Sequence, residues 1–78
     1  MDKTIGSREY WVQEIGNFRK LMGQKSFWRG DPGVAMGALL YCWVHTDGVN
    51  EADETLMDAT IREYDQRLAL VLANPDKV

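Results

Sequence analysis

The sequence predicts a small all-α domain, and three observations support this prediction. Apolar residues recur at spacings of three and four in three separate segments, which is the spacing of one helix face. No segment alternates apolar and polar residues as a half-buried strand would. The chain has 78 residues, enough for one domain. We therefore expect residues 1–78 to form a single helical domain, a three-helix bundle joined by short connections.

The first predicted helix runs from about residue 8 to residue 22. Ser7 can cap its start, because a serine hydroxyl accepts a hydrogen bond from a free amide of the first turn. One apolar face follows, made by Trp11, Ile15, Phe18 and Met22. Gly23 is expected to end the helix in a left-handed conformation. Residues 24–30 are predicted to be a linker whose adjacent Phe–Trp pair covers the end of the core.

The second predicted helix begins with Asp31 as N-cap and Pro32 as its first residue, where the missing proline amide costs nothing. Residues 34–44 are apolar or small on every side of this helix, which predicts a central helix, covered all round. Its small residues allow a neighbouring helix to approach closely: Gly33, Ala35, Gly37 and Ala38. Residues 46–48 end the helix.

The third predicted helix starts at Asn50, with Asp53 in the position of a reciprocal capping residue. An apolar stripe follows at spacings of four and three, made by Met57, Ile61, Tyr64, Leu68 and Val71. Residues 74–75, Asn-Pro, are expected to end it. Residues 68–73 are apolar almost all round, which is more than one small domain needs to bury. This surplus favours a homodimer paired through the third helix.

Several features predict a cytoplasmic protein without a membrane partner. Cys42 is the only cysteine, which excludes a disulfide within the chain and fits a reducing compartment. Residues 1–4 do not open a signal peptide. The longest apolar run, residues 34–44, is much shorter than the roughly 20 residues that a membrane-spanning helix needs.

Charge is divided unevenly along the chain. Residues 1–30 hold six basic and three acidic residues, whereas residues 31–78 hold three basic and nine acidic ones. On the third helix the acids gather along one flank, beside the apolar stripe: Glu51, Glu54, Asp58 and Asp65. This pattern predicts a surface that docks on a basic surface of another protein, with Tyr64 as its aromatic anchor. Alternatively, these acids complement the helix dipole, form a solvated face, or neutralise Arg8 and Arg19 within the domain.

A second candidate surface is basic, and it indicates a homodimeric nucleic-acid-binding regulator instead. Its residues are Arg8, Arg19, Lys20, Lys25, Trp28 and Arg29. Trp28 lies between two cations and would suit stacking on a base. Nucleic acid is nevertheless the less favoured partner, because the sequence pI is near 4.9 and the second helix is too apolar to lie in a groove.

The sequence offers no set of residues for catalysis, for a metal or for a cofactor. Cys42 and His45 lie three apart on one helix, but a structural zinc site needs four ligands and the chain has one cysteine and one histidine. Their ordinary interpretation is a packed thiol and a histidine at a helix end. No nucleophile and base are placed together. We therefore expect a protein that is not an enzyme.

Taken together, the acidic flank, the eight aromatic residues and the missing catalytic set predict a small non-enzymatic protein-binding domain. Short, acidic, helical proteins of this style are common in phages and mobile elements, where they act as inhibitors or adaptors of host machinery. We expect the chain to work by blocking a partner's basic surface. A third hypothesis is a structural subunit of a larger assembly, contacted through the apolar end of the last helix.

Overall fold

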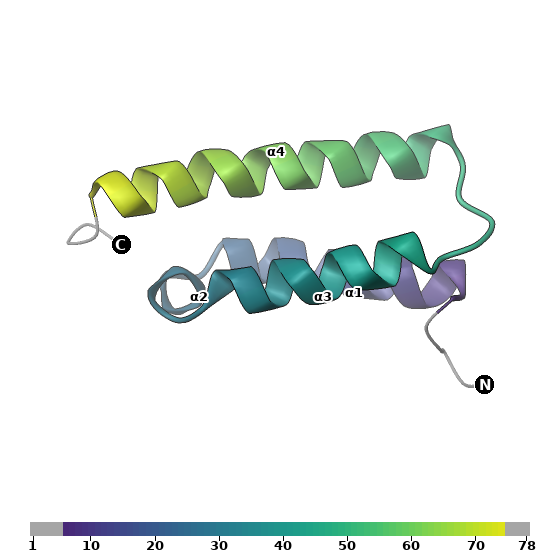
Figure 1. Ribbon diagram of the computed structural model, residues 1–78, viewed down its shortest axis with the longest axis horizontal. Coiled ribbons are helices and arrows are strands. Elements are labelled where there is room, and N and C mark those ends of the chain that lie inside the picture. The colour runs from purple at the N-terminus through teal and green to yellow at the C-terminus, as the bar shows by residue number, and fades with distance from the viewer. Residues whose placement is uncertain (1–5, 75–78) are drawn as a thin grey trace.

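In residues 6–74, which the computed structural model describes, the chain forms four helices (Figure 1). They are α1 (Arg8–Met22), α2 (Lys25–Arg29), α3 (Pro32–Val44) and α4 (Glu51–Ala73). No strand occurs among these residues, so the all-α prediction is confirmed. The expectations placed on residues 1–4 and on Pro75, and the charges of Asp2, Lys3 and Lys77, lie outside the described residues.

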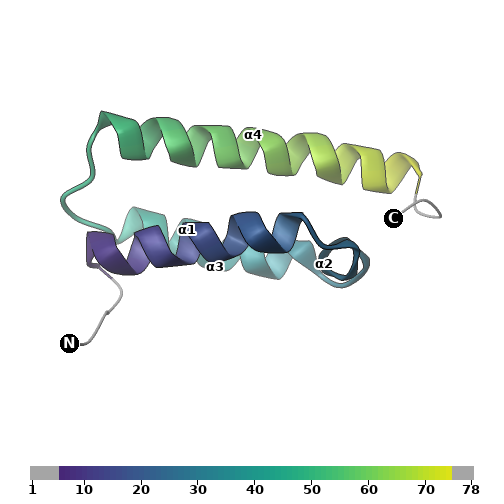
Figure 2. The same cartoon turned by 180° about the vertical axis from the view of Figure 1, so that it is seen from behind.

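The three longer helices run alongside one another, and α2 closes one end (Figures 1 and 2). Helices α1 and α3 are antiparallel neighbours. Helix α4 lies along this pair and runs in the same direction as α1. Helix α1 packs against each of the other three helices. The result is an elongated molecule measuring 42 × 24 × 16 Å.

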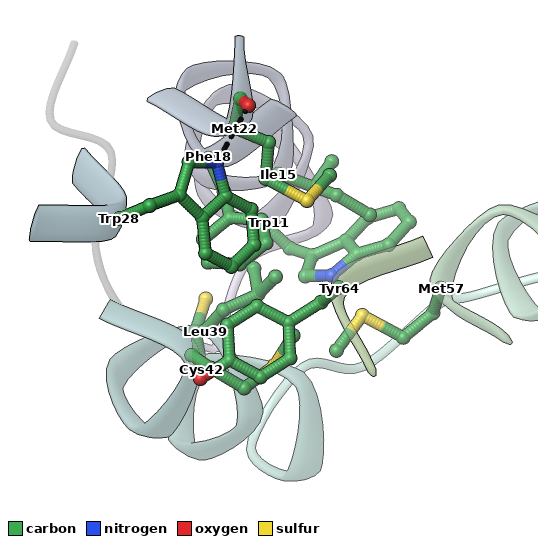
Figure 3. Close-up of a cluster of buried hydrophobic side chains, with 10 residues drawn as sticks. Trp11, Ile15, Phe18, Met22, Trp28, Leu39, Cys42, Met57 and Tyr64 are labelled. Carbon is green, nitrogen blue, oxygen red and sulfur yellow. Dashed lines mark hydrogen bonds between the residues drawn. The ribbon is translucent and has the colours of Figure 1, made fainter. Parts of the chain in front are cut away.

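The core is built around the predicted apolar face of α1, whose four members Trp11, Ile15, Phe18 and Met22 are all buried. Trp11 is the deepest, with no exposed surface, and its ring centroid lies 4.9 Å from that of Trp43. Among the described residues, its indole N–H is the one buried side-chain donor without a hydrogen-bond partner. From the other helices, Trp28, Met36, Leu39, Cys42, Met57 and Tyr64 complete the buried cluster (Figure 3).

The segment predicted as a linker contains a helix, α2, so that prediction is wrong. Five residues are too few to display a helical repeat in the sequence. The expected role of its two rings is confirmed: Trp28 is buried, and Phe27 is half-buried in a T-shaped contact with Phe18. The Trp28 indole N–H donates to the carbonyl of Met22 at 2.9 Å (Figure 3). This hydrogen bond gives the last carbonyl of α1 a partner.

Gly23 does not adopt the predicted left-handed conformation, since its φ is −82° and ψ is −3°. The amide of Gly23 donates to Lys20 and that of Gln24 to Leu21, which tightens the last turn of α1 just before α2 begins. The start of α3 at Asp31 and Pro32 is as predicted, although the Asp31 side chain makes no capping hydrogen bond.

Helix α3 was predicted to be covered on every side, and within one chain this is wrong. Its buried side consists of Met36, Leu39 and Cys42. Val34 and Val44 are 68% and 71% exposed. The reason lies in the arrangement: α1 and α2 pack on one side of α3, and in Figure 1 no helix lies in front of the other side.

Helix α4 begins with the predicted capping box. The Asn50 side chain accepts from the amide of Asp53 at 2.9 Å, and the Asp53 carboxylate accepts from the amide of Asn50 at 3.2 Å. The predicted apolar stripe faces the core, with Met57 and Tyr64 buried and the other three members half-buried. This face fixes which sides of α4 point outward.

Candidate functional site

The acidic flank of α4, formed by Glu51, Glu54, Asp58 and Asp65, is exposed along its whole length. At about 100° per residue the four side chains fall within an arc of about 60°, and they extend over about 20 Å of helix. Neither of the two ion pairs found in residues 6–74 uses any of them. The flank is therefore a negative strip facing solvent.

A bidentate ion pair fixes the start of α4 to α1. Arg8 donates from Nε to Asp53 Oδ2 at 2.6 Å and from its terminal nitrogen to Oδ1 at 2.7 Å. Asp53 is buried, with 4% of its surface exposed. The hydrogen bond from Arg8 lowers the pKa of Asp53 below its ordinary value and raises the pKa of Arg8. Both groups therefore remain charged over the physiological pH range.

A second arginine of α1, Arg19, is bound further along α4. Arg19 donates to the hydroxyl of Thr60 at 2.7 Å and to Glu63 Oε2 at 2.9 Å. Thr60 is fully buried, and its own hydroxyl donates to the carbonyl of Leu56 at 2.8 Å. A guanidinium anchored at its inner end in this way has little freedom to contact other molecules.

The sequence left open whether the acids of the flank neutralise Arg8 and Arg19 within the domain, and these two ion pairs give the answer. Arg8 and Arg19 are neutralised within the domain, but by Asp53 and Glu63, which lie outside the acidic flank. The helix-dipole interpretation fits Glu51 and Glu54, which stand in the first turn of α4.

Tyr64 is not an exposed anchor, which corrects its predicted role. It is 6% exposed, and its ring stacks on Trp28 with centroids 5.6 Å apart and planes inclined by 29°. Burial raises the pKa of its hydroxyl above the ordinary value. The physical reason is its position seven residues after Met57, which places both side chains on the core side of α4 (Figure 3). The helical repeat places the four acids on a different side of the helix.

The six residues of the basic candidate do not form one accessible surface. Trp28 is buried and its N–H is bound, so its ring is not available to stack on a base. Arg8 and Arg19 are paired on α4. The remaining three, Lys20, Lys25 and Arg29, are exposed. The predicted combination of cations around an aromatic stacking platform is therefore absent from the described part of the chain.

The Cys42–His45 pair has the ordinary interpretation predicted for it. Cys42 is buried, and burial raises the pKa of its thiol. His45 is exposed, with its ring centroid 4.4 Å from that of Tyr41. Across residues 6–74, no three or more His, Cys, Asp or Glu side chains are grouped so that they could hold a metal ion.

The sequence did not indicate the pocket of about 380 Å³ at the end of the molecule. It opens between α2 and the last turns of α4, next to Lys25, Trp28, Arg67 and Leu70. The Arg67 guanidinium lies 5.8 Å from the centroid of the Trp28 ring, which places a cation beside an aromatic wall. The pocket depends on α2, which is why no sequence pattern predicted it.

Comparisons with known protein families, with curated proteins and with solved structures found no match for this chain. Among the described helices, none combines the length and the apolar character needed to span a membrane.

Proposed function

We propose that the chain is a non-enzymatic protein-binding domain that docks the acidic flank of α4 on a basic surface of another protein. One observation carries the proposal. The four flank acids are exposed and take no part in the ion pairs of residues 6–74, whereas the other side of the same helix binds Arg8 and Arg19. The domain thus neutralises Arg8 and Arg19 with other acids of α4 and leaves the flank for a partner.

The flank has the properties of an electrostatic docking surface. Its four acids have one cationic neighbour on the helix surface, Arg62, so the strip keeps a net charge of −3. A rigid helix holds these charges in fixed positions, and complementary charge accelerates encounter and selects among partners. Such a surface fits a row of Lys and Arg side chains.

A domain of this kind acts by occupying its partner. Where the partner uses the basic surface to hold nucleic acid, the domain is an inhibitor; where it does not, the domain is an adaptor. Both roles suit the phage or mobile-element style of the sequence. The single buried cysteine suits a reducing, cytoplasmic setting.

The experiment combines capture with charge reversal. Tagged protein is used to capture partners from the lysate of its native host, and a captured partner is then purified and titrated by calorimetry at low and moderate salt. The variant carries lysine at all four flank positions. We expect it to lose the partner while retaining the far-UV helical signal, and we expect the native affinity to fall as salt rises.

A matched pair of variants separates the flank from net charge alone. Asp58→Asn with Asp65→Asn changes the charge by +2, and so does Gln13→Lys with Asn17→Lys on exposed positions of α1. The proposal requires weaker binding in the first pair and native binding in the second. Equal binding by both pairs, or unchanged binding after the four-fold reversal, would show that the partner uses another surface.

A further inference from the structure

Helix α3 carries no charged residue from Pro32 to Val44, yet about half of its surface faces solvent. Its exposed residues cover an arc of about 160°. On this arc lie Val34, Gly37, Ala38, Leu40, Tyr41 and Val44. We call this set the outer face of α3. Exposed helix faces in small proteins are normally polar, so an uncharged arc of this width indicates a surface that is covered in use.

At its centre the outer face carries two small residues between two larger ones. Val34 and Tyr41, 68% and 57% exposed, flank Gly37 and Ala38. The small pair lies near the middle of α3, whereas Leu40 and Val44 extend the face toward the end of the helix. About a two-fold axis at this centre, the small pair of one copy would meet the small pair of the other.

Gly37 has no packing role within the chain. A Cβ atom built on it meets nothing within 4 Å, and its backbone is helical. Glycine in the interior of a helix is less favourable than alanine. Because an alanine side chain would fit at position 37, packing within the chain does not explain the glycine. Gly16 on α1 is equally open but lies among polar residues such as Gln13 and Lys20, whereas Gly37 lies on the uncharged outer face. On such a face the missing side chain lets the axis of a second helix approach closely.

We propose that two copies of the chain associate through the outer face of α3, about a two-fold axis near Gly37 and Ala38. The small residues of both copies meet at the crossing point. Val34 of each copy then lies toward Tyr41 of the other. In this dimer α3 is covered on both sides, as its composition predicts, and the acidic flank of α4 remains outside the contact.

The available area fits a second copy. Val34, Leu40, Tyr41 and Val44 are 68%, 38%, 57% and 71% exposed. With roughly 150 to 200 Å² for each fully exposed residue, they present about 400 Å². Two faces that cover each other completely, small residues included, bury at most about 1,000 Å², the lower end of what a specific interface needs. We accordingly expect a weak dimer that forms in the micromolar range.

The test uses one substitution at two equivalent glycines. Gly37→Glu places a charge at the centre of the outer face. Gly16→Glu makes the same change on α1, where the glycine is also exposed, helical and without neighbours around a built Cβ. Glutamate is the better helix former at both positions, so neither variant is expected to lose helix. The oligomeric state is measured by sedimentation velocity from about 5 to 200 µM.

We expect the native chain and the Gly16→Glu variant to reach twice the monomer mass of 8.9 kDa as concentration rises. The Gly37→Glu variant should remain monomeric over the same range, with its dimer dissociation constant raised by about 100-fold or more. A third variant, Leu72→Glu, changes a residue that is 73% exposed at the end of α4, the dimer contact favoured from the sequence. It should associate like the native chain.

Three outcomes would overturn the proposal. A native chain that stays monomeric at the highest concentration excludes the second copy and leaves the outer face for an apolar segment of another protein. Association that persists in Gly37→Glu excludes this face. Association lost in Leu72→Glu but retained in Gly37→Glu relocates the contact to the end of α4.

Discussion

Trp28 on α2 and Tyr64 on α4 stack with ring centroids 5.6 Å apart, and both rings are buried. The Trp28 N–H is at the same time bound to the last turn of α1. Three helices thus meet at one aromatic pair, and the five-residue α2 depends on a residue of α4 for its position.

Removing the Tyr64 ring should destabilise the whole domain. Tyr64→Ala is expected to lower the free energy of unfolding by about 3 to 5 kcal/mol, because a buried aromatic ring leaves a cavity. Tyr64→Phe keeps the stack and should change it by less than about 1 kcal/mol. Urea denaturation followed by circular dichroism measures both. A small loss in the alanine variant would mean that the stack contributes little to the core.

Stability should fall in acid through Asp53. Its pKa is lowered in the folded state by the hydrogen bond from Arg8. The ionised pair therefore stabilises the fold above the ordinary carboxyl pKa of about 4, and this contribution is lost as pH falls through the lower folded value. Melting temperatures from pH 6 to pH 2 should decline more steeply for the native chain than for Asp53→Asn. Parallel curves would contradict the assignment.

Asn50 should contribute through its cap alone. Its side chain accepts from the amide of Asp53 at 2.9 Å. Asn50→Ala is expected to cost about 1 kcal/mol of unfolding free energy, since a first-turn amide loses its partner. Asn50→Ser retains a capping oxygen and is the control, with a loss of a few tenths of a kcal/mol expected. If both variants lost the same amount, the cap would not be the cause.

Cys42 should be nearly unreactive in the folded chain. It is 2% exposed, and burial raises the pKa of its thiol, so little thiolate is present to attack a reagent. We expect its reaction with a thiol-specific reagent to be at least about 100-fold slower in buffer than in denaturing urea. A Cys42→Ala chain with Val44→Cys, at a position 71% exposed, should react fast without urea.

The sequence predicted those parts of the fold that depend on the spacing of residues within one helix. The buried face of α1 and the cap and stripe of α4 follow from spacing alone, because both helices are long enough to show a period. Spacing cannot give the register between helices. The Arg8–Asp53 and Arg19–Glu63 pairs, which decide which acids of α4 are neutralised within the chain, were therefore not predictable.

Two predictions were wrong for the same reason: the sequence of one helix does not show what packs against it. The apolar composition of α3 indicates that it is to be covered, but not by which chain, so it was assigned to the centre of one domain. Tyr64 belongs to the predicted core stripe, and its neighbours in sequence suggested an anchor that its direction on the helix excludes. The acidic flank was predicted residue by residue, because helical geometry alone places its members.

The unequal attachment of α4 has a consequence for its dynamics. From its start to its middle the helix is held by the Asn50 cap and by Arg8 and Arg19 of α1, whereas beyond Leu68 its exposed side chains Leu70 and Leu72 contact little. Backbone amides should therefore exchange with deuterium quickly in the last turns and slowly around Met57. The helix opens from its C-terminal end, while the segment that bears the acids stays formed and keeps its shape before any partner arrives.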